Sequence, residues 1–314
     1  MLCYMKPTAA LPLLALALFA LPSRAEIRTV WAEGLTVAED GTVSGWYDFN
    51  KAFDGEDDLM CWAAATSNLL AWWQDRNPEA HAAANDPEGE DIWDTFQDSF
   101  TNNGGNAYYG LQWWMSGSYP SLDASKWSVL DGDNSGGYYS EYLTSSIKNS
   151  VEHFNMSSYR YTSLAAAVAD MVYYLGQGYG IALGLGSVEG NGGHAITLWG
   201  IEYDTATMEL TKLYVTDSDD HVNGWQYVQD GLLTLQCTKN SGLGYDSYSL
   251  RSLNTGDNLW YRDQMAIMDF AAINSTIPMN LPEIVDPGDS VPEPATGTLS
   301  LLALAALMAR RRRG

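Results

Sequence analysis

The chain has 314 residues and is strongly acidic, with 39 Asp and Glu against 16 Lys and Arg and a formal net charge of −23. A surface of this sign repels nucleic acid and anionic membranes, so neither is expected as a partner. Three cysteines are too few for a disulfide scaffold, whereas a hydrophobic content of 46% is enough for the core of one large domain.

The first residues predict a secretory signal peptide. Met5-Lys6 precedes an apolar run from Ala9 to Leu21, and small residues then stand at the positions that a signal peptidase reads. We expect residues 1–25 to be removed, which also removes Cys3. Cys61 and Cys237 then remain, and a bridge between them in an oxidising compartment is the alternative to two free thiols.

The region after this leader predicts two short strands and then a helix. The strands are Thr29–Trp31 and Gly45–Asp48, with the acidic turn Glu39–Gly41 between them. The helix is predicted to begin near Asp58, to be buried on one side and to end at Arg76-Asn77-Pro78.

The rest of the chain predicts sheet more than helix. Long Gly- and Asn-rich loops between short helices are expected from about 80 to 161, followed by a helix from about Ser163 to Leu175. The predicted strands are Ile181–Leu185, His194–Ile201, Leu210–Thr216, Leu232–Cys237 and Leu259–Tyr261. Helices early and antiparallel sheet late predict an α+β fold, with residues 26–276 as one domain and 277–290 as a linker.

Cys61 is the first candidate for chemistry, because it stands where an acidic turn gives way to the predicted helix. Unpaired N–H groups and the helix dipole in the first turn favour a thiolate. A lone cysteine beside apolar residues is more often a buried core thiol, and Cys237 keeps that interpretation.

His194 and Asp217 are the candidate base and its orienting carboxylate. A two-residue turn centred between Thr205 and Ala206 would place them directly opposite each other on neighbouring strands. His194 would then take the Cys61 proton and return it to the leaving amine, while Asp217 fixes the imidazole tautomer. The backbone N–H of Cys61 is the first expected oxyanion donor.

Two stretches of the sequence resemble the immunoglobulin-degrading cysteine proteinases of the IdeS/Mac family. The first runs through Gly45-Trp46-Tyr47-Asp48, Lys51, Phe53, Gly55, Asp57-Asp58-Leu59, Cys61, Ala63-Ala64, Trp72-Trp73 and Asn77. The second comprises His194 with Leu198-Trp199-Gly200, and Tyr214-Val215-Thr216-Asp217-Ser218-Asp219.

This resemblance implies a papain-like fold with Cys61 as nucleophile, His194 as base and Asp217 as orienter, without a cofactor or a metal. It further implies that Lys51 belongs to the oxyanion hole and that Asp219 supports the catalytic histidine. Trp62 stands where the family has Gly, and Gly193 where an Asn is usual. The expected partner is an extracellular protein, immunoglobulin G or another host glycoprotein.

The C-terminal residues 291–314 resemble a PEP-CTERM sorting signal. Val291-Pro292-Glu293-Pro294 precedes an apolar run from Leu299 to Ala309 and four consecutive arginines. The run is shorter than the ~20 residues of a usual bilayer span, which favours a transient anchor over a permanent one. The resemblance implies export from a Gram-negative bacterium, with release or attachment at the cell surface.

Several residues have less specific interpretations. His81, His153 and His221 are expected at the surface, and Trp113-Trp114 in the core rather than in a sugar-binding platform. Asp217–Asp220 and Asp131–Gly136 resemble calcium loops only in part. The competing functions are a catalytically silent surface binding protein and a transglutaminase-like enzyme that transfers acyl groups to amines.

Overall fold

The computed structural model describes residues 25–52, 54–147, 150–155, 164–187, 192–219, 231–241, 246–253 and 264–282. The predicted leader, the C-terminal sorting segment, most of the linker, the strand at 259–261 and His221 therefore lie outside the described residues. No helix within the described ranges has the length and apolar character that crossing a bilayer requires.

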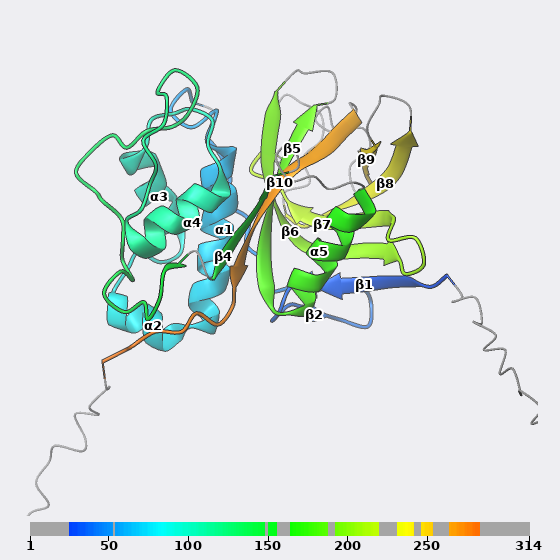
Figure 1. Ribbon diagram of the computed structural model, residues 1–314, viewed down its shortest axis with the longest axis horizontal. Helices are drawn as coiled ribbons and strands as arrows, with labels where there is room; N and C mark the ends of the chain where they lie inside the picture. Colours follow the sequence, from blue (N-terminus) through cyan, green and yellow to red (C-terminus); the bar gives the residue numbers. More distant parts are fainter. Residues whose placement is uncertain are drawn as a thin grey trace, which may run out of the picture.

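The described residues form two parts that lie side by side, one of helices and one of antiparallel sheet, which confirms the α+β prediction (Figure 1). The helical part holds α1 (Cys61–Arg76), α2 (Pro78–Ala84), α3 (Glu90–Ser99) and α4 (Ala107–Ser116). One further helix, α5 (Leu164–Gly176), packs on the sheet against β5 and β1.

The sheet joins eight strands, all paired antiparallel. They are β1 (Ile27–Trp31), β4 (Val151–Asn155), β5 (Tyr179–Ser187), β6 (Gly193–Asp204), β7 (Leu210–Thr216), β8 (Leu233–Ser241), β9 (Asp246–Ser252) and β10 (Gln264–Asn274). Their order is β1-β6-β5-β10-β9-β8-β7, and β4 pairs with β10. Because β7 also pairs with β6, the strands from β6 round to β7 close into a ring.

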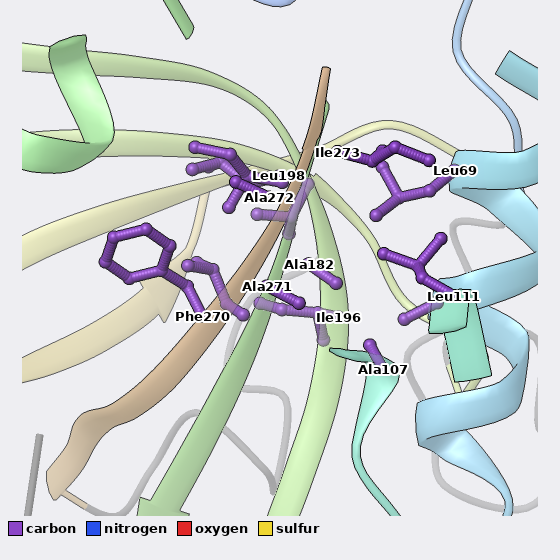
Figure 2. Packing of buried hydrophobic residues seen from close by; sticks show 14 of the residues in the cluster. Leu69, Ala107, Leu111, Ala182, Ile196, Leu198, Phe270, Ala271, Ala272 and Ile273 are labelled. Carbon is purple, nitrogen blue, oxygen red and sulfur yellow. The ribbon is translucent and has the colours of Figure 1, made fainter. Parts of the chain in front are cut away.

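The core lies where α1 and α4 meet β5, β6 and β10. Leu69 of α1 and Leu111 of α4 face sheet residues such as Ala182 and Ile273 (Figure 2). Close approach of α1 to the sheet depends on Gly180, since a Cβ there would lie 2.9 Å from both Leu69 and Trp72 side-chain atoms.

Helix α1 differs from its prediction in two ways. It begins at Cys61 and not near Asp58, because backbone groups before Cys61 form other hydrogen bonds. The Met60 N–H donates to Asp57 O, and Lys51 Nζ donates to Asp58 O. It is also buried on all sides, since every residue from Trp62 to Gln74 is buried. Its predicted end at Arg76 is confirmed.

The predicted strand at Gly45–Asp48 is wrong. The short hairpin instead pairs β2 (Thr36–Val37) with β3 (Val43–Ser44), around the predicted Glu39–Gly41 turn. Side chains are the hydrogen-bond partners of the backbone that follows β3: Thr216 Oγ1 donates to Tyr47 O, and the Phe49 N–H donates to Asn68 Oδ1.

The predicted register between β6 and β7 is also wrong. The turn is longer than two residues, with the Asp204 N–H donating to Glu209 O, and the register shifts by one residue at two places along the ladder. Thr197 consequently pairs with Thr216, and β7 ends before Asp217. His194 and Asp217 are therefore not cross-strand partners, although their side chains meet beyond the end of β7.

Candidate functional site

Cys61 is the first residue of α1, and its partly exposed side chain is a free thiol. The N–H groups of the first helical turn have no partner within a helix, so this position favours an anion. Cys237 is also a free thiol, buried in β8. The bridge between the two that the sequence left open is therefore not formed.

His194 lies between Cys61 and Asp217. Its Nε2 is 2.6 Å from Asp217 Oδ1, and a further hydrogen bond joins the imidazole to the Cys61 thiol. Because Nε2 faces Asp217, Nδ1 is the ring nitrogen left for the thiol. The Asp219 N–H donates to the same Asp217 oxygen at 3.0 Å, which holds a carboxylate that is fully buried.

The electrostatics favour a charged thiolate and imidazolium pair. Burial raises the pKa of Cys61, but the hydrogen bond from His194 and the positive charges of His194 and Lys51 outweigh it, so the pKa is lowered. Burial likewise opposes charging of His194, yet Asp217 and Asp219 hold its pKa well above the usual value. Both shifts favour the thiolate and imidazolium pair over the pair of neutral groups.

Lys51 and Asp219 form a buried ion pair beside this group. Lys51 Nζ lies 2.8 Å from Asp219 Oδ1 and donates to Asp58 O, also at 2.8 Å. The other carboxylate oxygen, Asp219 Oδ2, lies 4.0 Å from His194 Nδ1 and has no hydrogen-bond partner among the described residues. The structure thus brings together all five residues that the sequence singled out.

His194, Asp217 and Asp219 could also be considered as metal ligands, because one ligand atom from each lies within 4.8 Å of the others. However, Asp217 is already bonded to His194, and the ammonium of Lys51 neutralises Asp219. This donor set fits proton transfer better than it fits a cation.

Three buried polar residues next to the site were missed by the sequence interpretation. They are Asn68 in α1, Thr197 in β6 and Thr216 in β7, and the Asn68 amide joins the two threonine hydroxyls. An Asn within a helix and threonines within strands are ordinary in sequence, so only the fold shows that they meet.

The remaining candidates lie elsewhere. His81 and His153 are partly exposed at the surface, as predicted: His81 bonds to Asp86 and Glu88, and His153 stacks on Tyr108. Trp113 and Trp114 are fully buried, which confirms their predicted place in the core. Burial raises the pKa of Cys237, as expected of a core thiol.

Comparison with known proteins places these residues within a family. The sequence model described as Mac 1 matches residues 36–86 and 115–249, together more than half of the chain. The first stretch includes Cys61, and the second includes His194 and Asp217.

One similar protein is the IgM protease of Streptococcus suis (strain P1/7), which is 25% identical over 263 residues. The alignment covers 69% of this chain but 22% of that protein, so the chain spans about a fifth of the length of this relative.

Proposed function

Because the chain belongs to the Mac-1 family, we propose that it is an exported cysteine endopeptidase with a papain-like fold and that it cleaves an extracellular protein. Immunoglobulin is the first substrate to test, since the similar protein from Streptococcus suis is named for cleaving IgM. Immunoglobulin G and other host glycoproteins follow.

One observation carries the proposal: a thiol at the start of a helix, with its pKa lowered, is hydrogen-bonded to a histidine that is itself bonded to a buried carboxylate. A core thiol has no such partners. Cys237 in the same chain provides the contrast, because its pKa is raised by burial.

In the proposed reaction, His194 holds the Cys61 proton and the thiolate attacks the carbonyl carbon of the peptide bond. The resulting oxyanion is stabilised by the backbone N–H of Cys61. The His194 imidazolium then protonates the departing amine, which leaves a thioester that water hydrolyses with His194 as base. Asp217 keeps the imidazole in the required tautomer and orientation.

Lys51 is the proposed second oxyanion donor. Its ammonium is held by Asp219 and by Asp58 O, so it must share or exchange one of these contacts when a substrate oxygen arrives. Asp219 supports the positive charge of both Lys51 and His194.

The proposal of export is based on the sequences at the two ends of the chain. Residues 1–25 are proposed to direct secretion, and residues 291–314 to act as a sorting signal that is processed at the membrane of a Gram-negative bacterium. Mass spectrometry of the protein recovered from the producing cell tests both cleavages.

The test of mechanism is the alkylation rate of the two thiols in the full chain as a function of pH, mapped by mass spectrometry. We expect Cys61 to react with iodoacetamide well below the ~8.5 pKa of a free thiol, and His194→Ala to abolish that advantage. Cys237 is the internal control and should stay unlabelled in the native protein. A Cys61 rate that rises only near the free-thiol value would contradict the mechanism.

The test of function is incubation of IgM and IgG with the wild type and with Cys61→Ala, followed by sequencing of new chain ends. Cleavage by the wild type alone supports the proposal. Binding without cleavage by either protein would select a silent binding protein. Incorporation of a fluorescent amine without new chain ends would select acyl transfer.

A further inference from the structure

We propose that Asn68 is the positioning residue that sets Cys61, His194, Asp217 and Lys51 relative to one another. This inference rests on the proposed function, because it concerns the same site. Asn68 contacts none of the reacting atoms and acts through the segments that carry them.

Asn68 lies on the same face of α1 as Cys61, because seven residues are close to two helical turns. Its side chain is buried, with 1% of its surface exposed. The amide nitrogen Nδ2 donates to Thr197 Oγ1 at 2.9 Å and to Thr216 Oγ1 at 3.3 Å, and Oδ1 accepts from the Phe49 N–H at 2.8 Å.

Each of these contacts reaches a segment that carries one site residue. Thr197 follows His194 by three residues in β6, and Thr216 directly precedes Asp217. Phe49 precedes Lys51 by two residues. One amide on the nucleophile's helix therefore ties together the three other segments of the site.

The orientation of the amide is fixed by its surroundings. The Phe49 N–H can only donate, so the atom facing it must be the carbonyl oxygen, and the amino group must face the threonines. Thr216 Oγ1 in turn accepts from Trp199 Nε1 and donates to Tyr47 O, both at 2.8 Å. This network has a single arrangement, which a positioning role requires.

The burial of the network explains why an amide is needed there. A leucine of similar size would leave the Phe49 N–H and a threonine hydroxyl facing an apolar group, and buried polar groups move to find partners. Such a movement changes the spacing of Cys61 and His194. A displacement of ~1 Å in an active site can reduce the rate by about 10²-fold.

The experiment compares Asn68→Leu with Gln74→Met. Gln74 is a matched control, because it is a buried amide on the same helix whose bonds go to Asp86 Oδ2 and Pro87 O, away from the site strands. Both variants lose a buried amide, so both lower the urea midpoint of unfolding. Only Asn68→Leu should alter the chemistry of Cys61.

The readouts are the pH profile of Cys61 alkylation and, where a substrate is cleaved, kcat and KM. For Asn68→Leu we expect alkylation at pH 6 to fall at least about 10-fold and its midpoint to move toward the ~8.5 of a free thiol. kcat should fall by about 10- to 100-fold, with KM changed less than about twofold. Gln74→Met should keep the wild-type alkylation profile and kcat.

A second pair of variants keeps the test decisive if Asn68→Leu does not fold. Thr216→Ser retains the hydroxyl and should resemble the wild type, whereas Thr216→Val removes it and should shift the alkylation profile in the direction expected of Asn68→Leu. Wild-type alkylation that is fast at low pH, with profiles unchanged in Asn68→Leu and Thr216→Val, would overturn the role of Asn68 alone. A wild-type Cys61 without activation would overturn the proposed function itself.

Discussion

Lys51 Nζ and Asp219 Oδ1 lie 2.8 Å apart, and neither side chain is more than 3% exposed. A buried ion pair of this kind is costly to break from one side, because the remaining charge stays in a medium that solvates it poorly. The pair also borders the site, since Lys51 favours the thiolate of Cys61 and Asp219 opposes it.

Lys51→Met should therefore lower both the stability of the protein and the reactivity of the Cys61 thiol. Removal of one partner of a buried pair costs about 3–5 kcal/mol in the free energy of unfolding, which urea titration measures. The pKa of Cys61 should rise, because the positive charge of Lys51 is lost, and alkylation below neutral pH should slow.

Two further variants test whether the loss of stability comes from the unpaired buried charge of Asp219 or from the loss of a lysine alone. The double variant Lys51→Met with Asp219→Asn removes both charges and should recover most of the lost stability. Lys212→Met breaks the more exposed Lys212–Glu202 pair, of 3.1 Å, and should cost less than about 1 kcal/mol. Equal losses for Lys51→Met and Lys212→Met would contradict the argument.

Gly105→Ala should be more harmful than Gly104→Ala, although the two positions are adjacent. A Cβ at Gly105 would lie 2.3 Å from the ring of Trp62, which is fully buried against Phe96 and Phe100. Overpacking of this kind costs about 1–3 kcal/mol, or several degrees in Tm.

Gly104 is the matched position, because a Cβ there would meet only Lys126 O, at 3.6 Å. Calorimetry of the two alanine variants gives the comparison. Similar Tm values for the two variants would contradict this prediction and show that the Trp62 ring can move to make room for the methyl group. Trp62 directly follows Cys61, so a displaced ring in Gly105→Ala should also lower the rate of Cys61 alkylation.

His81 should make stability depend on pH, with a loss that begins at its ordinary pKa of 6.5 and continues above it. Burial lowers its pKa, but hydrogen bonds and charges from Asp86, at 2.7 Å, and Glu88, at 3.2 Å, raise it above the ordinary 6.5 overall. A pKa that is higher in the folded state stabilises fully below the unfolded-state value and progressively less as pH rises through the folded-state value.

The free energy of unfolding of the wild type should consequently fall more between pH 6 and 9 than that of His81→Gln, by urea titration at each pH. His194 also has a raised pKa, but it titrates in both proteins and cancels in the difference. Glu88→Gln should keep most of the slope, because the buried Asp86 remains. Parallel curves for the wild type and His81→Gln would refute this assignment.

The sequence predicted the helix and strands of the site better than the register in which β6 and β7 pair. Local signals predict the end of α1 at Arg76 and the strands β5 to β7. These signals are the periodicity of apolar residues and the glycines that mark turns. The pairing of His194 with Asp217 was predicted from a two-residue turn, and it arises instead beyond the end of a strand with a shifted register. A register shift depends on tertiary packing and leaves no local pattern.

The Asn68 network lies beyond sequence reasoning for a different reason. Its members come from α1, β6, β7 and the segment after β3, and each residue type is common in its own element. Trp62 is similar, because only the fold shows that the absence of a side chain at Gly105 makes room for its large ring.

The separation of Cys61 from His194 and Asp217 along the chain has a consequence for biosynthesis. Cys61 lies in the early helical part, whereas His194, the first of the groups that lower its pKa, comes from β6. An unfolded chain thus carries an ordinary thiol at Cys61. The lowered pKa of this thiol requires the sheet to close and to pack against α1, so folding itself sets the reactivity of Cys61.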